Sequence, residues 1–142
     1  VPEARQGLRV RTMPTPRPQL MSFPFGGIDA QGRLDWTREN SSVREVMLNI
    51  LLTRKGERLM RPEFGAGLRD YIHQPNTETT RALIADAARR AIERNEPRVQ
   101  VEEVQALADP ERLSHVNLSI HYRLRWDGSA QTLDLAIDLG TV

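Results

Sequence analysis

The chain contains no cysteine, so it cannot form a disulfide framework, a thiolate nucleophile or a cysteine-based metal site. This absence is typical of proteins of the cytosol, or of particles assembled there. Hydrophobic residues make up 39% of the sequence and aromatic residues only 5%, which predicts a small core. No apolar run approaches the length of a membrane-spanning helix, and no apolar h-region follows the N-terminus. We therefore expect no association with a membrane.

A large excess of one charge is also missing. The 142 residues include 20 basic and 19 acidic side chains, for a net charge of +1. Domains that bind a phosphate backbone usually carry a large basic excess, so this balance argues against nucleic acid as the main partner. The length fits one domain of ordinary size.

Residues 1–21 differ in composition from the rest of the chain. They hold four arginines against one glutamate, together with four prolines that favour an extended backbone. Two interpretations stay open: a disordered tail, or an arm whose arginines become ordered on an acidic partner. We expect residues 22–142 to form a single domain.

Two segments are predicted to be amphipathic helices. Residues 40–53 space their apolar side chains three and four apart, and Ser42 and Glu45 have the S-x-x-E spacing of a capping box. Residues 77–95 begin at a threonine that can cap the helix, and their apolar stripe consists mostly of small side chains. Since small side chains allow close approach, we expect this second helix to pack flat against a sheet.

The C-terminal third of the chain is predicted to form a hairpin. Residues 116–126 and 129–139 alternate apolar and polar side chains, and residues 127–128 are Asp-Gly, a preferred two-residue turn. A two-residue turn would place Tyr122 opposite Leu133, with every apolar pair on one face.

Two further strands complete the expected sheet. Residues 99–108 read as a strand whose alternation breaks at Glu102-Glu103, which indicates a bulge or a bend. A short strand is expected at residues 33–37, and a short helical turn at residues 68–72. The elements together predict an α+β fold: a small antiparallel sheet of three to four strands with two main helices packed on one face.

Residues 52–71 lie between the two predicted helices and are dense in glycine, charge and large apolar side chains. One proline and three glycines prevent a single continuous helix here. The composition fits a catalytic loop, a nucleic-acid contact or a protein-docking surface. We expect two glycines to direct the path, two apolar side chains to anchor it and two charged side chains to form ion pairs: Gly56 and Gly65, Leu59 and Phe64, Glu57 and Arg58.

Three carboxylates lie in irregular segments, where catalytic groups often lie: Glu57, Glu63 and Glu96. Glycosidases use two carboxylates that flank the scissile bond, so a lysozyme-like peptidoglycan hydrolase using Glu57 or Glu63 is one alternative. Each of the three has an arginine close in sequence, however, and a neighbouring arginine favours an ion pair over a general acid.

Cofactor and metal sites have no support in the sequence. The three histidines show neither metal-ligand spacing nor a Ser-His-Asp arrangement: His73, His115 and His121. The glycines of residues 52–71 do not form a P-loop, because no Gly-Lys-Ser/Thr opens a helix after a strand. We expect no metal, no cofactor and no small-molecule substrate.

The segment Glu96-Pro97-Arg98 joins the second predicted helix to the following strand. Three interpretations stay open. The two charges are exposed at a helix stop, or the turn presents Arg98 to an acidic partner, or Glu96 pairs with a basic group of residues 52–71.

Two motifs resemble those of a known family. Residues 50–65, ILLTRKGERLMRPEFG, are similar to the signature IL-T--GER-M-P-FG of the gene-product-twenty-five-like (GPW-type) baseplate wedge proteins of contractile phage tails. Relatives of that family occur in type VI secretion (TssE) and in phage-tail-like injection particles. Glu96-Pro97-Arg98 resembles its E-P-R motif at the start of a strand. The resemblance covers residues 23–142 and leaves the basic arm outside.

The resemblance implies a structural protein rather than an enzyme, located in the tail baseplate of a virion or in the baseplate of an injection machine. Assembly would take place in the bacterial cytoplasm. The implied partners are the sheath subunit and other wedge proteins, with tail tube or hub proteins as further candidates. The family starts the sheath by strand exchange. The motif positions that would carry partner-binding or structural roles are Gly56, Glu57, Arg58, Met60, Pro62, Phe64, Gly65, Glu96, Pro97 and Arg98. A nucleic-acid-binding module that uses the basic arm is the second alternative, after the hydrolase.

Overall fold

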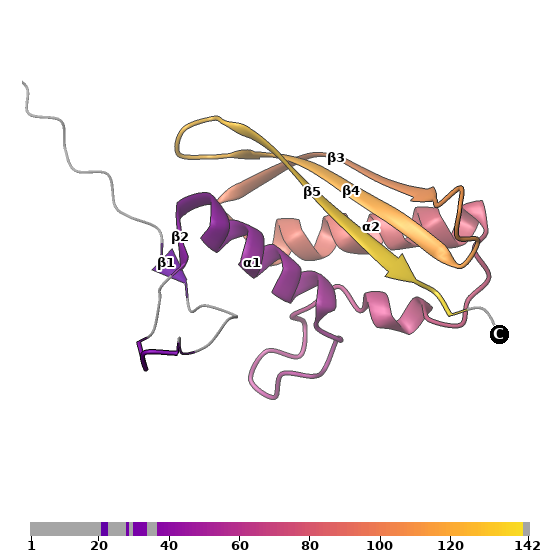
Figure 1. Ribbon diagram of the computed structural model, residues 1–142, viewed down its shortest axis with the longest axis horizontal. Coiled ribbons are helices and arrows are strands. Elements are labelled where there is room, and N and C mark those ends of the chain that lie inside the picture. The colour runs from indigo at the N-terminus through magenta and orange to yellow at the C-terminus, as the bar shows by residue number, and fades with distance from the viewer. Residues whose placement is uncertain (1–20, 23–27, 29, 34–36, 141–142) are drawn as a thin grey trace, which may run out of the picture.

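The computed structural model describes residues 21–22, 28, 30–33 and 37–140. The predicted arm, apart from its last residue, and residues 34–36 of the predicted short strand lie outside this part of the chain. Strands β1 (Met21–Ser22) and β2 (Thr37–Arg38) pair with each other in antiparallel fashion, next to the start of the first helix (Figure 1).

Helix α1 (Glu39–Leu52) carries the predicted apolar stripe into the core. The predicted capping box is wrong, because the helix begins three residues before Ser42 and places that residue inside the helix. Strand β2 leads directly into the helix at Glu39. The Ser42 hydroxyl is buried, and it has no hydrogen-bond partner in the described part of the chain.

Helix α2 (Glu78–Asn95) begins as predicted, since the Thr77 side chain accepts a hydrogen bond of 3.2 Å from the backbone N–H of Thr80. Its buried face is narrow and includes two alanines, Ala88 and Ala91, and the helix packs along the sheet. Leu83, a large member of the apolar stripe predicted for residues 77–95, is not buried, because half of its surface is exposed. No helix among the described residues is long and apolar enough to cross a membrane.

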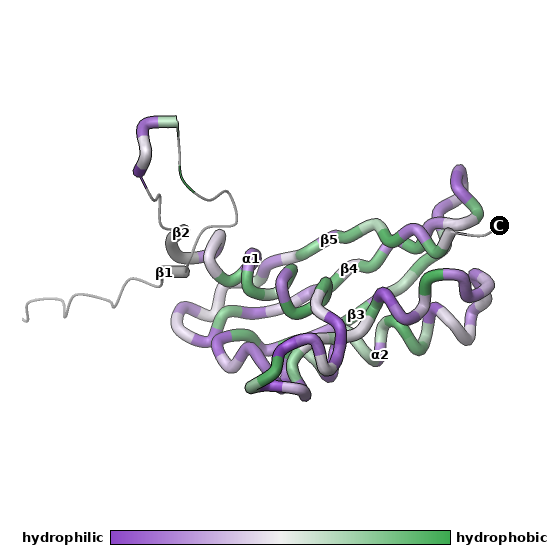
Figure 2. The backbone as a smooth tube through the Cα atoms, turned by 90° about the horizontal axis from the view of Figure 1, so that it is seen from below, coloured by the Kyte–Doolittle hydropathy of each residue, from purple (hydrophilic) through white to green (hydrophobic). Residues whose placement is uncertain are grey.

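Three long strands form the main sheet: β3 (Val99–Ala108), β4 (His115–Leu124) and β5 (Ala130–Asp138). Their order is β3-β4-β5, all neighbours are antiparallel, and α1 and α2 cover one face (Figure 1). The predicted α+β class is therefore confirmed. The predicted bulge is also confirmed, because the β3–β4 register shifts between Val101 and Glu103. Apolar and polar residues alternate along β4 and β5 (Figure 2).

The hairpin register differs from the prediction by two residues. Leu133 lies opposite Ile120, not opposite Tyr122, whose partner is Gln131. Side chains alternate between the faces of a sheet with a period of two, so this shift leaves every apolar side chain on the predicted face. The hydrophobic pattern therefore cannot distinguish the two registers.

The turn decides the register of the hairpin. The Leu124 N–H donates to the Ser129 carbonyl at 3.0 Å, which closes a loop of residues 125–128 instead of the predicted Asp-Gly pair alone. The Gly128 N–H donates to the Leu124 carbonyl at 2.9 Å, with a φ of +72° at Gly128. The Asp127 carboxylate accepts the Ser129 N–H and so stabilises this longer turn.

Between the two helices lie residues 53–67, which we call the charged loop, and the short 3-10 helix η1 (Leu68–Tyr71). The 3-10 helix matches the predicted helical turn to within one residue. The charged loop projects from the end of α1, away from the sheet (Figure 1).

Candidate functional site

The base of the charged loop is fastened to the end of α1. The Ala66 N–H donates to the Ile50 carbonyl at 2.9 Å, and the Gly67 N–H donates to the Thr53 carbonyl at 3.2 Å. Gly65 passes so close to this helix end that a Cβ atom would lie 2.4 Å from the Thr53 carbonyl oxygen. Its φ of +104° also lies in the left-handed region, so glycine is required here.

The outer part of the loop closes on itself. The Gly56 N–H, at a residue with a φ of +79°, donates to the Pro62 carbonyl at 2.8 Å. The Glu57 carboxylate accepts the backbone N–H of Arg54 at 2.8 Å. Gly56 and Gly65 therefore direct the path of the loop, as predicted.

Phe64 anchors the loop to the core, as predicted, with only 5% of its surface exposed. The guanidinium carbon of Arg58 lies 3.9 Å from the centre of the Phe64 ring, and that of Arg61 lies 5.5 Å from it. These are cation–π contacts. The predicted ion pairs of Glu57 and Arg58 are not found within residues 37–140, because Glu57 accepts a backbone N–H and Arg58 stacks on the ring.

Leu59 and Met60 form the tip of the charged loop, with 96% and 94% of their surfaces exposed. The predicted anchoring by Leu59 is wrong. The Arg61 N–H donates to the Arg58 carbonyl at 3.1 Å, and this turn directs the two intervening side chains outward while Phe64 takes the anchoring position. Two adjacent large apolar side chains held in solvent are a feature of contact surfaces.

A cleft of about 210 Å³ separates the loop from α2. It is crossed by an exposed ion pair, with Arg94 Nη1 at 3.1 Å from Glu63 Oε2. The half-exposed Leu83 lines the same cleft beside Lys55 and Arg90. Glu63 is therefore tied to the helix, and the cleft mixes apolar surface with charges of both signs.

The turn at residues 96–98, which we call the E-P-R turn, is closed by its own charges. Both oxygens of Glu96 accept from Arg98, at 2.7 Å from Nε and 2.6 Å from Nη2, and the Arg98 backbone N–H adds a third bond of 3.1 Å. Glu96 is only 2% exposed. The hydrogen bond to Glu96 raises the pKa of Arg98, because it stabilises the charged guanidinium.

This geometry excludes two of the three interpretations of the turn, and the presentation of Arg98 to an acidic partner stays a prediction. Glu96 is not a surface charge, and it does not pair with a basic group of the charged loop. The Arg98 side chain keeps 28% of its surface exposed but is held in a fork by Glu96. Any partner would therefore meet an oriented and already neutralised pair rather than a single positive charge.

The three candidate catalytic carboxylates are all engaged. Glu57 accepts a backbone N–H, Glu63 pairs with Arg94, and Glu96 accepts three hydrogen bonds from Arg98. Each carboxylate is thus already bound to a donor of the protein itself, whereas a general acid must reach the group of the substrate to which it gives its proton. No group of three metal-ligating side chains occurs in the described ranges.

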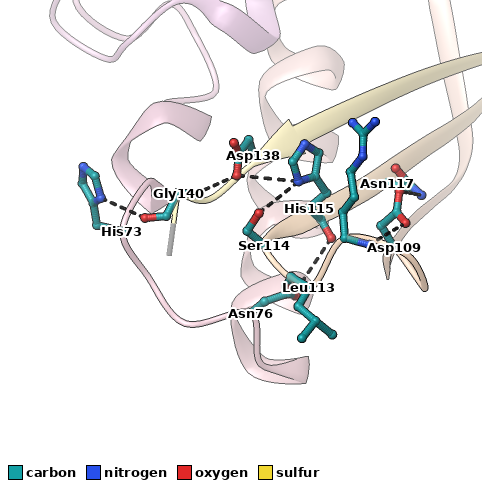
Figure 3. A network of polar contacts seen from close by, with 10 residues as sticks. His73, Asn76, Asp109, Leu113, Ser114, His115, Asn117, Asp138 and Gly140 are labelled. Atoms are coloured by element: carbon teal, nitrogen blue, oxygen red, sulfur yellow. Dashed lines mark hydrogen bonds and ion pairs between the residues drawn. The ribbon is translucent and has the colours of Figure 1, made fainter. Parts of the chain in front are cut away.

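A serine, a histidine and an aspartate lie together at one end of the sheet (Figure 3). The sequence did not predict that these three side chains are neighbours. Ser114 Oγ lies 3.0 Å from His115 Nδ1, and Asp138 Oδ1 lies 3.7 Å from the same nitrogen. In a catalytic triad the serine and the aspartate contact different ring nitrogens, so this cluster does not match one. The Gly140 N–H, followed by Ser114, lowers the pKa of Asp138, which fits a structural contact at the strand end.

Comparisons with known proteins agree on one family. The family model described as Baseplate wedge protein gp25 matches residues 37–129. The Baseplate wedge protein gp25 of Enterobacteria phage T4 is 31% identical over 81 residues, which cover 53% of this chain and 61% of the phage protein. The chain thus spans less than two thirds of that relative.

Solved structures show the same fold. A protein of Geobacter sulfurreducens, provisionally named a tail lysozyme, is 31% identical, with a TM-score of 0.62 over 69% of this chain and 88% of its own. A chain of the anti-feeding prophage baseplate is 20% identical, with a TM-score of 0.62 over 86% of this chain and 87% of its own. A chain of the type VI secretion baseplate complex is 16% identical, with a TM-score of 0.56 over 70% and 93%.

Proposed function

Since residues 37–129 match its model, this chain belongs to the Baseplate wedge protein gp25 family, and we propose that it is a structural component of the baseplate of a contractile tail or injection machine. It docks neighbouring wedge proteins through the charged loop. It also starts the sheath by accepting an extended segment of a sheath subunit at its sheet. The observation that carries this proposal is the exposed apolar tip of the charged loop, Leu59 and Met60.

The charged loop has the properties of a docking element. Its base and its outer part are held by backbone hydrogen bonds, so little conformational entropy is lost when a partner binds. Burying each apolar tip side chain would contribute roughly 1.5–3 kcal/mol. Four cations lie close to the tip in sequence: Arg54, Lys55, Arg58 and Arg61. An apolar pocket with an acidic rim is the partner surface that fits, with the charges fixing the orientation.

The sheet supplies the second docking element. Three strands leave two outer edges whose backbone groups can pair with an added strand. Strand addition gives affinity through main-chain hydrogen bonds and register through alternating side chains. The sheath subunit is the proposed donor of this strand.

Hydrolysis of peptidoglycan is the competing function, and the provisional name of the Geobacter sulfurreducens protein keeps it in view. The engagement of Glu57 and Glu63 argues against it. Zymography on peptidoglycan with wild type, Glu57→Gln and Glu63→Gln separates the two functions. We expect no clearing in any lane; clearing by the wild type that either substitution abolishes would favour the hydrolase.

The docking role is tested by the double variant Leu59→Ser/Met60→Ser. Leu113→Ser is the matched control, because Leu113 is 85% exposed on a different loop. Each variant is co-expressed with the neighbouring wedge, tube and sheath genes, and sheathed particles are counted by electron microscopy. We expect the double variant to fold normally and yield no sheathed particles, while the control assembles like wild type. Normal assembly by the double variant would refute docking through the loop tip.

A further inference from the structure

We propose that β5, and not β3, is the edge that receives the added strand, and that the donor is a partner segment with apolar side chains at alternate positions and basic side chains between them. This inference rests on the proposed function, since it specifies where and with what chemistry strand addition takes place. Four observations carry it: the free backbone groups of β5, the interrupted edge of β3, an apolar groove beside β5, and the charge of β5.

The free backbone groups of β5 follow from its register with β4. The Leu139 N–H donates to the Ser114 carbonyl at 2.9 Å, and the Leu124 N–H donates to the Ser129 carbonyl at 3.0 Å. Both pairs keep the register of the whole hairpin. In an antiparallel ladder, pairs of residues that hydrogen-bond to each other alternate with pairs whose backbone groups point away from the neighbouring strand. Since residues 129 and 139 bond to the partner strand, the odd-numbered residues of β5 are the ones that bond to β4.

The even-numbered residues of β5 direct their backbone N–H and C=O groups away from β4, toward the outer edge of the sheet: Thr132, Asp134 and Ala136. No hydrogen bond to these backbone groups comes from the rest of the described chain. The row of free groups ends at Leu139, whose carbonyl accepts the His73 N–H at 2.6 Å. β5 also has no bulge in its pairing with β4. It is therefore an unbroken edge whose outward backbone groups have no partner in the described part of the chain.

The opposite edge is interrupted by two features that proteins use against strand addition. The bulge between Val101 and Glu103 breaks the line of backbone groups. Arg89 Nη2 donates to the Glu102 carbonyl at 2.8 Å, which occupies an acceptor at the bulge. An added strand would meet this irregular and partly occupied edge in place of a continuous one.

An apolar groove of about 190 Å³ runs between β5, the end of α1 and η1. Its walls include Leu135 and Ile137 of β5, and it continues over Leu52, which is half exposed, to Ile72. Side chains of an added strand that point to the helix-covered face would enter this groove. The groove therefore requires apolar residues at alternate positions of the donor.

Charge specifies the other face of the donor. β5 carries two acidic residues and no basic one, and both carboxylates, Asp134 and Asp138, lie exposed on the polar face. An added strand would place its polar-face side chains directly beside them, where opposite charges attract and like charges repel. Basic residues at the intervening positions of the donor satisfy this complementarity.

Two matched proline substitutions test the choice of edge. Ala136 and Ala108 are both exposed and both direct their N–H away from β4, so proline removes an outward donor without breaking the sheet. In the co-expression assay with the sheath and baseplate genes, we expect Ala136→Pro to reduce sheathed particles at least tenfold and Ala108→Pro to leave them unchanged.

If Ala108→Pro reduced sheathed particles and Ala136→Pro did not, the added strand would lie at β3, which would overturn this inference but would still support strand addition. Normal assembly with both substitutions would refute strand addition itself, independently of the loop-tip test. If Ala136→Pro unfolds, as judged by circular dichroism, Asp134→Lys replaces it. We expect that charge reversal also to reduce sheathed particles, whereas Asp134→Asn should have a smaller effect. Normal assembly with Asp134→Lys would refute the basic donor.

The chain's own basic arm is the rival occupant of the edge. We expect amide hydrogen exchange at Asp134 and Ala136 in the isolated protein to be unchanged when residues 1–20 are deleted. Slower exchange in the full chain than in the truncated chain would assign the edge to the arm and overturn the assignment to a partner. In sheathed particles the same two amides should become protected, and unprotected amides there would contradict the inference.

Discussion

The charged loop and the E-P-R turn carry the same kinds of side chain but use them in opposite ways. In the E-P-R turn Glu96 is 2% exposed, and its two oxygens and the guanidinium of Arg98 satisfy each other. In the charged loop, backbone hydrogen bonds and two glycines hold the chain, and the apolar tip lies in solvent.

The difference separates a structural motif from a contact motif. A buried, bidentate ion pair is satisfied within the folded protein, and removing one of its partners leaves the other charge buried without an opposite charge. An exposed apolar side chain gains almost nothing until another molecule covers it. We therefore expect substitutions in the turn to affect stability, and substitutions at the loop tip to affect assembly.

The largest change in stability is expected for Glu96→Gln. Loss of the carboxylate leaves the largely covered Arg98 unpaired and should lower the free energy of unfolding by roughly 3 kcal/mol. Urea denaturation followed by circular dichroism measures this. Glu63→Gln is the control, because its ion pair is exposed and should contribute less than about 0.5 kcal/mol. Equal losses for the two variants would remove the distinction between turn and loop.

Gly65→Ala should have the next largest effect. The new Cβ would meet the Thr53 carbonyl at 2.4 Å, in a backbone conformation that already disfavours alanine, so we expect a loss of about 2 kcal/mol. Gly56→Ala is the control, because Gly56 also has a positive φ but no atom lies within 4 Å of an added Cβ. This variant should lose about 1 kcal/mol of the free energy of unfolding. A larger loss at Gly56 would show that the close approach at Gly65 is relieved easily.

Arg58→Ala should reduce stability by about 0.5–1 kcal/mol, because it removes the cation–π contact at 3.9 Å from the Phe64 ring. Arg61→Ala, with its guanidinium at 5.5 Å, should have the smaller effect. Thermal unfolding of the two variants side by side compares them. A greater loss for Arg61 would mean that the arginines act through charge and not through the ring.

The smallest effect on folding is expected at the tip. Leu59→Ser should change the free energy of unfolding by no more than about 0.5 kcal/mol, because the side chain is 96% exposed. Differential scanning calorimetry is the measurement. A clear destabilisation would mean that Leu59 packs within the protein and would weaken its proposed role in docking.

Local patterns were sufficient for much of the fold. Apolar spacing predicted both helices, alternation predicted the three long strands, and a change of parity predicted the bulge next to Glu103. These features are determined by near neighbours in sequence. The register of the hairpin was not accessible in this way, because a shift of two residues leaves every side chain on the same face.

In the candidate site, too, some features follow from the local sequence and others only from the tertiary structure. The sequence by itself determined the family motifs, the prediction that Gly56 and Gly65 direct the path of the loop, and the apolar character of Phe64 and Leu59. Only the tertiary structure decided that Phe64 enters the core while Leu59 points outward, that Glu96 pairs with Arg98, and that Arg89 occupies the Glu102 carbonyl at the edge of β3. Composition states what a side chain can do, whereas burial, pairing and exposed edges depend on which distant segments the fold brings together.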